Sequence, residues 1–392
     1  MNSSTKNKEQ LLVILSRFPY PLDKGDKLRA YHQIKELSNH FDVTVVAITD
    51  EEISEARIKK VQEICKQLVL SRINFFTKMS NMLLRLIRME PLQVGYFFSR
   101  ATSKKISQLI QQNDFNHIYC QLIRTSEYVK NIHHIPKTID YMDTLSVGMS
   151  RQINRQPFYK KWVYRLEAKR LTKYEQHIFD YFEHKTIISQ QDKELIQHPE
   201  KDKIVCIPNG IDETFFEATE NTEEFDFVFV GNMSYPPNID AVQYIAERIM
   251  PSFEHSTLLI SGASPAPSVK ELANSNSQIR LTGWVDDIRE SYTKGKIFIA
   301  PMMIGTGMQN KLLEAMALKI PCVTTPLANN AIGAQHQIEI MVGENANELI
   351  SCIQELLNDV SRRNEIGEKG SSFVKQKYTW SDSVEKLVEL IG

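Results

Sequence analysis

The segment GTGMQNKLLEAMALKIPCVTTPLA, from Gly305 to Ala328, is the most informative stretch of this 392-residue chain. Gly305 and Gly307 allow a tight turn and a close backbone approach to a ligand. We expect a helix to begin near Met308, and its unpaired first amides and positive dipole end are well suited to a diphosphate. Lys311 adds a mobile positive charge one turn into that helix. The simpler alternative is a plain loop–helix junction packed by leucines and methionines.

Glu314 is a lone carboxylate inside the expected helix, with the apolar neighbours Leu313 and Ala315. A buried charge is costly unless it is hydrogen-bonded, so Glu314 needs a partner. The vicinal hydroxyls of a sugar would serve, because one carboxylate can accept two O–H bonds. The structural alternatives are an ion pair with Lys311 or a cap for a neighbouring helix.

Short apolar runs alternate with helical patterns along the whole chain. Strands are expected at residues 11–16, 43–49, 117–123, 137–143 and 184–189, and again at 225–231, 256–262, 278–285, 296–302 and 320–326. Such alternation predicts an α/β fold with parallel, doubly wound sheets. The chain length suits two domains better than one core.

We predict two Rossmann-like domains, residues 1–205 and 206–375, with a C-terminal helix at residues 376–392 packing back on the first. Residues 207–224 are acidic and read as a linker between the halves. In open α/β sheets ligands bind outside the carboxyl ends of the strands, so the cleft between two such domains is the expected site. A dinucleotide dehydrogenase is disfavoured, because neither half has GxGxxG after its first strand.

The composition is that of a globular protein with 42% apolar residues and a formal net charge of −1. This charge disfavours nucleic acid as a partner. The five cysteines are far apart and never form CxxC, so a disulfide framework or zinc site is not expected and a reducing cytoplasm fits best. The apolar run from Leu11 to Leu15 is shorter than a signal-peptide core, and no stretch approaches a membrane span.

The opening segment resembles the donor-binding segment of GT-B glycosyltransferases, in particular the large retaining group called family 4. FVFVGNMSYPPNIDAV, LTGWVDDIRESY and IPNGID resemble other C-terminal landmarks of that family in the right order, and FPYPLDKGDKLRAYHQIKEL resembles the N-terminal glycine loop of a subgroup of bacterial sugar transferases. The resemblance covers nearly the whole chain. It implies a GT-B enzyme that moves a sugar from a nucleotide-activated donor, with retention and without a metal or cofactor.

The resemblance also assigns the donor site, with two departures from the family pattern. Glu314 matches the second of two glutamates spaced eight apart and would hold the nucleotide ribose, whereas Thr306 stands at the first. The Arg and Lys that often follow the first strand of the C-terminal domain are absent from GNMSYPPN. Lys319 replaces the glycine that commonly ends the helix, so we expect that helix to end differently. The remaining expected donor contacts are Gly231, Asn232, Gly307, Met308, Gln309 and Lys311.

Trp284 and Val285, in LTGWV, would line the base pocket, or Trp284 is a core or interface aromatic. On the acceptor side the resemblance points to Gly25, beside Asp26 and Arg29 on the next helix. Asp26 also has the type of an N-cap, and Arg29 is equally well read as a surface residue. Gln121 stands where many family members have a histidine. Asp143 ends a strand and is expected to orient or deprotonate the acceptor hydroxyl, or to cap the next helix.

Two basic segments complete the expectations. The run from Arg151 to Lys173 and the amphipathic segment 75–89 together indicate a surface facing anionic lipid or a lipid-diphosphate acceptor, at the inner face of the membrane. A solvated helical face is the alternative for each. The main hypothesis is a glycosyltransferase with Lys311 and Asp143 as catalytic residues, acting on a glycan or lipid-linked acceptor in polysaccharide or glycoconjugate synthesis. A nucleotide-sugar 2-epimerase and a non-catalytic binding protein of the same fold are the alternatives.

Overall fold

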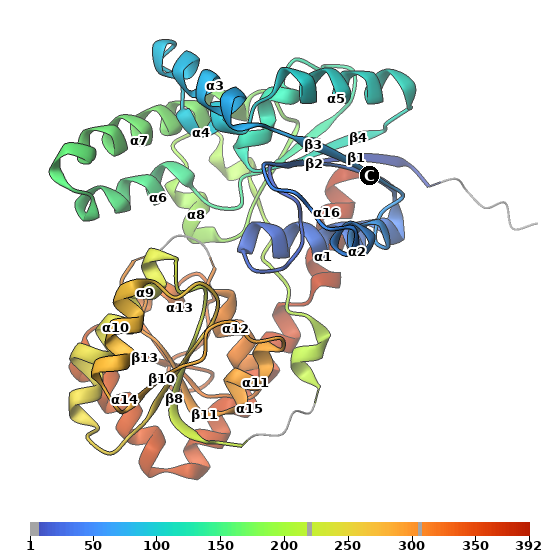
Figure 1. The fold of residues 1–392 in the computed structure, drawn as a ribbon. Helices are drawn as coiled ribbons and strands as arrows, with labels where there is room; N and C mark the ends of the chain where they lie inside the picture. Colours follow the sequence, from blue (N-terminus) through green and yellow to red (C-terminus); the bar gives the residue numbers. More distant parts are fainter. Residues whose placement is uncertain (1–7, 218–221, 305–307) are drawn as a thin grey trace, which may run out of the picture. The chain divides into compact units, whose positions relative to one another are not determined.

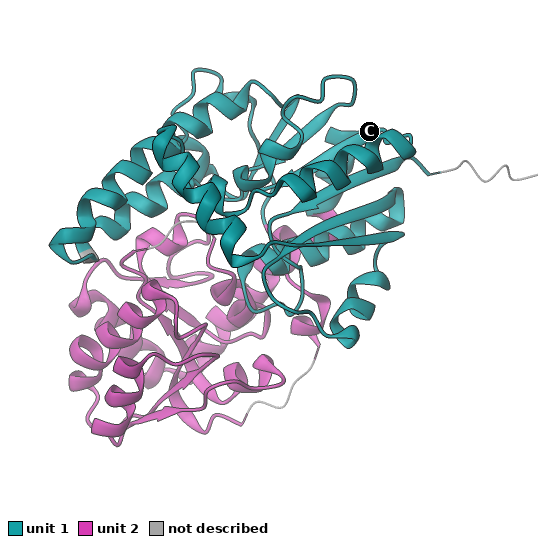
Figure 2. Cartoon of the chain, turned by 45° about the horizontal axis from the view of Figure 1, so that its top comes forward, with its two compact units in different colours: residues 1–208, 383–392 teal, residues 209–382 magenta. Residues whose placement is uncertain are grey.

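The computed structural model describes residues 8–217, 222–304 and 308–392 of the chain. The chain divides into two compact units, coloured separately in Figure 2. Unit 1 comprises Met1–Pro208 together with Ser383–Gly392, and unit 2 comprises Asn209–Asp382. The chain's last segment therefore returns to unit 1, where Val384 and Leu387 pack in one of its cores.

The described part of unit 1 forms a seven-stranded parallel sheet in the order β3-β2-β1-β4-β5-β6-β7. Along β1 the buried side chains alternate between two cores, with Leu12 and Ile14 in one and Leu11, Val13 and Leu15 in the other. A strand buried on both faces needs such a continuous apolar run. The strands are β1 Gln10–Leu15, β2 Asp42–Thr49, β3 Gln67–Arg72, β4 His117–Gln121, β5 Lys137–Asp140, β6 His184–Ile187 and β7 Val205–Cys206.

Helices cover both faces of this sheet (Figure 1). They are α1 Gly25–His40, α2 Glu55–Gln62, α3 Phe75–Ile87, α4 Leu92–Tyr96, α5 Arg100–Gln112, α6 Leu145–Gln152, α7 Phe158–Phe179, α8 Gln190–Leu195 and the C-terminal α16 Trp380–Ile391. None of the helices in the described ranges is long and apolar enough to cross a membrane.

Unit 2 holds a six-stranded parallel sheet within its described residues, in the order β10-β9-β8-β11-β12-β13. Its strands are β8 Phe225–Val230, β9 Leu258–Ser261, β10 Ile279–Leu281, β11 Gly295–Ala300, β12 Cys322–Thr324 and β13 Met341–Val342. Its helices are α9 Pro236–Tyr244, α10 Pro267–Ser275, α11 Ile288–Thr293, α12 Asn310–Ala317, α13 Pro326–Asn329, α14 Ala346–Asn358 and α15 Val360–Lys377. The prediction of two doubly wound parallel sheets is confirmed.

Each sheet has one point where the strand order reverses. In unit 1 the reversal lies between β1 and β4: β2 and β3 follow β1 toward one edge of the sheet, and β5 to β7 follow β4 toward the other. In unit 2 the reversal lies between β8 and β11. Open α/β sheets bind ligands beside the carboxyl ends of the strands at such a point. The loops after β1, β4, β8 and β11 are therefore the positions to search for a site.

Helix α12 ends in a left-handed cap despite its lysine. Lys319 has a φ of 62°, its N–H donates to the Met316 carbonyl at 2.9 Å, and the Ile320 N–H donates to the Ala315 carbonyl at 3.0 Å. These two bonds form a Schellman motif, which usually places glycine at this position. The expectation that the helix ends differently is therefore wrong. The cap is closely packed, since a Cβ on Gly367 would lie 2.2 Å from the Lys319 carbonyl oxygen.

Lys319→Gly is expected to raise the free energy of unfolding by about 1 kcal/mol, because glycine adopts the left-handed region without the Cβ penalty. The exposed ion pair between Lys319 and Glu368 is lost in this variant, but such pairs contribute little. Denaturant unfolding with Lys319→Ala as the control separates the two effects. A glycine variant no more stable than the alanine variant would contradict the argument.

Candidate functional site

The carboxyl ends of β8 and β9 approach each other very closely in unit 2. Gly262 has a φ of 142°, and a Cβ there would lie 1.8 Å from the Gly231 carbonyl oxygen. A Cβ on Gly231 would lie 2.6 Å from the Asn238 amide nitrogen. The Asn232 side chain accepts from the Ser234 N–H at 2.9 Å and the Ser234 hydroxyl at 2.7 Å. Gly231 and Asn232 thus shape the turn into α9 at the edge where a ligand would lie.

Lys311 lies at the strand-order reversal of unit 2. Its ammonium donates to the Asn238 Oδ1 and sits 5.2 Å from the centroid of the Phe229 ring. Asn238 in turn donates to the Asn232 carbonyl at 2.9 Å. Lys311 on α12 is thereby tied to α9 and to the turn after β8.

The charge of Lys311 is poorly compensated. Burial lowers the pKa of this ammonium to about 8, and the nearby negative charge of Glu314 opposes that shift only in part. Within the described ranges, no carboxylate oxygen lies at ion-pair distance from its Nζ. The proposed ion pair between Lys311 and Glu314 is therefore wrong. A half-buried cation whose nearest partner is a neutral amide is well placed to receive an anion.

Glu314 is held by a buried tyrosine rather than by a helix cap. Its Oε2 accepts a hydrogen bond from the Tyr292 hydroxyl at 2.7 Å, and Tyr292, on α11, is fully buried. Burial raises the pKa of the Glu314 carboxyl, while the Tyr292 bond and the charge of Lys311 act in the opposite direction. In the described part of the chain nothing donates to the other oxygen, Oε1. One oxygen is thus fixed and the other remains available to a ligand hydroxyl.

The expected base loop follows β10 and is anchored through hydroxyl groups. Thr282 donates to Ser261 at 2.9 Å, and Ser261 is 2.6 Å from Ser291. Trp284 exposes 62% of its side chain, so the reading of Trp284 as a core aromatic is wrong. Val285 is half-buried. An exposed aromatic beside the strand ends is available to stack on a planar base.

The start of α12 differs slightly from the prediction. The helix begins at Asn310 rather than near Met308, and Gln309 takes the cap position without a side-chain bond. Met308 and Gln309 are half-buried beside it. Gly305, Thr306 and Gly307 lie outside the described residues, so their expected roles stay predictions.

At the strand-order reversal of unit 1, Asp26 is not the N-cap that its residue type indicated. Helix α1 begins at Gly25 and its cap position is Lys24, so Asp26 lies in the first turn. Its carboxylate accepts from Arg17 at 2.6 Å, and Gln121 donates to its carbonyl at 3.0 Å. A Cβ on Gly25 would meet nothing within 4 Å, so the backbone there borders open space.

Arg29 was expected as an acceptor contact or a surface residue, and both expectations are wrong. Its side chain is completely buried, and its Nε is 2.6 Å from the Asp140 carboxylate at the end of β5. Asp140 also accepts from the Tyr119 hydroxyl at 2.8 Å and from Thr186 at 3.0 Å. A buried charge pair needs such additional bonds, and here they join α1 to three strands.

Sequence reasoning missed a pair of arginines at this edge. Arg17 follows β1 and Arg124 follows β4, and their guanidinium carbons lie 5.8 Å and 4.9 Å from the centroid of the Phe97 ring. Arg124 donates to the Gln93 side chain at 2.7 Å, but its buried Nε has no partner among the described residues. The signal in the sequence was their place, directly after the two strands where the order reverses.

The pKa of Arg124 reflects its burial and the charges around it. Burial, and secondly the positive charge of Arg17, lower the pKa of Arg124 to about 10, against the opposing charges of Asp26 and Asp143. Arg17 is paired with Asp26, whereas the Arg124 Nε has no partner among the described residues, so Arg124 is the group here that a bound anion would satisfy. The geometry therefore gives unit 1 an anion-attracting edge.

Asp143 is half-buried after β5 and does not cap α6. The cap position is Thr144, and the helix end is instead satisfied by Glu175, which accepts from the Ser146 N–H at 3.0 Å and the Ser146 hydroxyl at 2.5 Å. Burial raises the pKa of Glu175 to about 7, and the charge of Asp143 adds to this shift. Asp143 thus faces both a cation, Arg124, and a carboxyl that titrates near neutrality.

Comparison with known proteins points to glycosyltransferases. Residues 224–359 match the model of the family described as "Glycosyl transferases group 1". A curated relative, an uncharacterized 44.6 kDa protein in the cps region of Klebsiella pneumoniae, is 25% identical over 395 residues, covering 94% of this chain and 96% of the relative.

Solved structures share the fold over nearly the whole chain. Sucrose-phosphate synthase of Thermosynechococcus elongatus matches with a TM-score of 0.74 at 12% identity, covering 98% of both chains. HepE of Anabaena, in complex with UDP and glucose, matches with a TM-score of 0.72 at 12% identity, covering 97% of this chain and 99% of the other. A glycosyltransferase of Rickettsia africae matches with a TM-score of 0.67 at 15% identity, covering 98% of both chains. At these identities the matches establish the two-domain fold.

Proposed function

We propose that this chain, a glycosyltransferase with the GT-B fold whose residues 224–359 form its group 1 domain, takes its sugar from a nucleoside diphosphate donor bound by unit 2. The sugar passes to a glycan or lipid-linked acceptor bound by unit 1. The observation that carries this proposal is the poorly compensated ammonium of Lys311 beside the half-satisfied carboxylate of Glu314. HepE, a structural relative, binds UDP and glucose, which supports a nucleotide donor.

In this proposal the donor's diphosphate takes the place of Asn238 as the main partner of Lys311. The Glu314 Oε1 accepts from the ribose hydroxyls while Tyr292 keeps the carboxylate oriented. Trp284 and Val285 border the base. As the glycosidic bond breaks, negative charge grows on the leaving diphosphate, and a cation fixed beside it stabilises the transition state more than the ground state. Lys311 is thus the catalytic residue of unit 2.

The acceptor is assigned to the edge of unit 1 near Gly25 and Asp143. Arg124, whose Nε has no partner among the described residues, makes this edge suitable for an acceptor that carries a negative group, such as a lipid-linked phosphate. Asp143 orients the acceptor hydroxyl, and the leaving phosphate takes its proton, with retention of configuration and with the nucleotide sugar as substrate rather than cofactor. The cps-region relative favours a role in surface polysaccharide synthesis.

The test is a panel of UDP-, GDP- and ADP-sugars, offered with lipid-linked and soluble acceptors, in which nucleoside diphosphate release and the fate of the sugar are both followed. The proposal predicts release coupled to appearance of the sugar on an acceptor. A sugar altered without any acceptor would instead indicate a 2-epimerase. Nucleotide binding without turnover across the panel would contradict the proposal.

Donor affinity is expected to fall as the pH rises above 8. The pKa of Lys311 in the free protein is about 8, so above this value binding of an anion must first return a proton to the ammonium. The affinity should change little just below this pH and fall by up to about tenfold per pH unit above it. Calorimetric titration with a nucleoside diphosphate on both sides of pH 8 checks this. Lys311→Arg should remove the dependence, because arginine keeps its proton there.

Arg124→Gln is expected to raise the KM for an anionic acceptor about tenfold, since one charge-assisted hydrogen bond is lost. The KM for the donor should not change, because the donor is assigned to unit 2. Steady-state kinetics with each substrate varied in turn measure the two values. Arg72→Gln, a substitution at an exposed arginine of unit 1, serves as the control. An unchanged acceptor KM would exclude Arg124 from the acceptor site.

A further inference from the structure

Helix α3 lies at the outside of unit 1 (Figure 1), and this helix and the turn after it carry large apolar side chains that are exposed. Phe76 is 82% exposed and Ile87 72%. The large apolar side chains exposed here, which we call the α3 surface, are Phe75, Phe76, Met79, Leu83, Leu84, Leu86, Ile87 and Met89. No acidic residue occurs between Phe75 and Met89. Phe75, Met79, Leu83 and Ile87 follow one another at four-residue intervals, which places them on one face of the helix, and exposed apolar residues gathered in this way mark an interaction site.

The α3 surface is rigidly mounted, which a binding element requires. Arg170 of α7 is buried and donates to the Leu86 carbonyl at 3.3 Å and to the Glu90 carbonyl at 3.4 Å. Glu167, one turn earlier, accepts from the backbone N–H groups of Leu92 and Gln93 at 3.0 Å each. Arg170 was expected in a basic surface, and it is instead a structural residue that fastens the end of α3 to α7.

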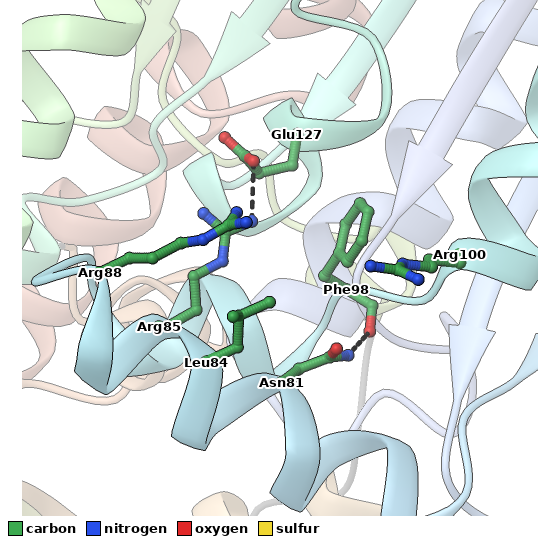
Figure 3. Close-up of a pocket in the computed structure, with 7 residues that line it drawn as sticks. All are labelled: Asn81, Leu84, Arg85, Arg88, Phe98, Arg100 and Glu127. Atoms are coloured by element: carbon green, nitrogen blue, oxygen red, sulfur yellow. Dashed lines mark hydrogen bonds and ion pairs between the residues drawn. The ribbon is translucent and has the colours of Figure 1, made fainter.

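A cavity of about 250 Å³ opens between α3 and the start of α5 (Figure 3). It is lined by Asn81, Leu84, Arg85, Arg88, Phe98, Arg100 and Glu127. Arg85 is paired with Glu127 at 2.8 Å, and Asn81 donates to the Phe98 carbonyl at 2.6 Å, so these groups form the walls. The volume is below the range typical of drug-sized ligands, so a small headgroup fits it better.

The cavity carries excess positive charge. Figure 3 shows Arg88 and Arg100 on opposite sides of Arg85 and Phe98. Both arginines are exposed, and no carboxylate of the described residues pairs with either. Arg100 is also the first residue of the 13-residue helix α5, whose N-terminus adds a positive dipole end. Arg85 is paired with Glu90 as well as with Glu127, so the excess positive charge comes from Arg88, Arg100 and the helix N-terminus.

We propose that the α3 surface docks on an anionic bilayer and that the cavity beside it holds the phosphate of a lipid headgroup. Leu84 belongs to both the apolar surface and the cavity wall, so acyl chains and headgroup would meet the protein at adjoining places. An apolar helical face beside unpaired arginines matches the bilayer interface in both polarity and charge. This proposal does not depend on sugar transfer. Docking on the bilayer would, however, hold unit 1 at the surface where lipid-linked acceptors lie.

The test is co-sedimentation of the full chain with vesicles of phosphatidylcholine, with and without phosphatidylglycerol. The wild-type chain should bind the anionic vesicles more tightly. Arg88→Ala with Arg100→Ala should weaken that binding on the order of 30-fold, at about tenfold or less per arginine, and lower the preference for phosphatidylglycerol. Phe76→Ser with Leu83→Ser and Ile87→Ser should weaken binding to both vesicle types. These side chains are exposed, so the thermal midpoint should not change.

Lys270→Ala with Lys375→Ala, two exposed lysines of unit 2, is the matched control and should bind as the wild type does. Wild-type binding that ignores phosphatidylglycerol, or arginine variants that bind normally, would overturn the proposal. Phe158 and Trp162, at the start of α7, are also exposed apolar residues. If Phe158→Ser with Trp162→Ser abolishes vesicle binding while the α3 variants bind normally, the membrane surface lies at the start of α7 and the assignment to α3 is overturned. A further outcome is that the wild type does not bind vesicles, while inorganic phosphate raises the thermal midpoint of the wild type but not that of the arginine variant. This outcome would indicate a site for free phosphate instead of a lipid headgroup.

Discussion

Replacing Lys311 with methionine is expected to lower kcat by about 100- to 1,000-fold, the loss typical of one preorganised group that stabilises charge in a transition state. The ammonium lies at the strand-order reversal of unit 2, tied to Asn238 and facing the Phe229 ring, and no carboxylate of the described residues neutralises it. Methionine keeps the unbranched side chain and removes the charge. The measurement is nucleoside diphosphate release at saturating donor.

The same substitution should not destabilise the fold at pH 7. The pKa of Lys311 is lowered by burial, so the native state gives up this proton more readily than the unfolded chain does. Stability is therefore lower below pH 8 and rises between pH 8 and the ordinary lysine pKa. Replacing Lys311 with methionine removes the free-energy cost of burying this charged ammonium in the native state. Lys296→Met, which breaks the half-buried pair with Asp226 on the same sheet, is the control and should keep normal activity. A Lys311→Met enzyme with near wild-type kcat would exclude the catalytic role.

Glu314→Gln is expected to weaken donor binding by about 10- to 100-fold, because charge-assisted hydrogen bonds to the ribose are replaced by neutral ones. The amide oxygen of glutamine still accepts from Tyr292, so the free energy of unfolding should hardly change. Glu314→Ala is less informative, because it leaves the buried Tyr292 hydroxyl without a hydrogen-bond acceptor, which lowers the free energy of unfolding by about 1–3 kcal/mol. Calorimetric titration with the preferred nucleoside diphosphate gives the affinities.

Tyr292→Phe completes the comparison. It keeps the Glu314 carboxyl in place but removes the bond that orients this group and lowers its pKa, so donor affinity should fall less than in Glu314→Gln. If donor affinity is unchanged in both variants while stability falls, Glu314 is a structural residue and the ribose contact is wrong.

Both sheets were predictable because strands buried on two faces need uninterrupted apolar runs, which stand out in the sequence. β3 was missed because Gln67–Arg72 lies at the edge of its sheet, and its apolar run is only three residues long, from Leu68 to Leu70. β7 and β13 are two-residue edge strands that carry no pattern at all. Strands also ended earlier than expected, as at Leu281, because loop residues continued the apolar pattern.

Spacing alone could place together only those site residues that are neighbours in the chain, such as Lys311 and Glu314, which lie one turn apart on a single helix. The more distant Gly231, Asn232 and Trp284 were assigned to the site only through the resemblance. Arg17 and Arg124 meet only because β1 and β4 are adjacent in the sheet, which no local pattern states. The burial of Arg29 was not predicted, because helical periodicity does not indicate which residue pairs with a buried carboxylate. The bond from Tyr292 to Glu314 was not predictable either, because the tyrosine lies on another helix.

The central claim is that the donor's diphosphate binds Lys311 while its ribose binds Glu314. The most direct measurement is a crystal structure of the chain with its preferred nucleoside diphosphate bound. The account predicts a phosphate oxygen about 2.7–2.9 Å from the Lys311 Nζ, with the ribose hydroxyls on the Glu314 carboxylate opposite Tyr292. A nucleotide bound elsewhere, or bound in unit 2 while Lys311 remains on Asn238 without touching phosphate, would contradict it.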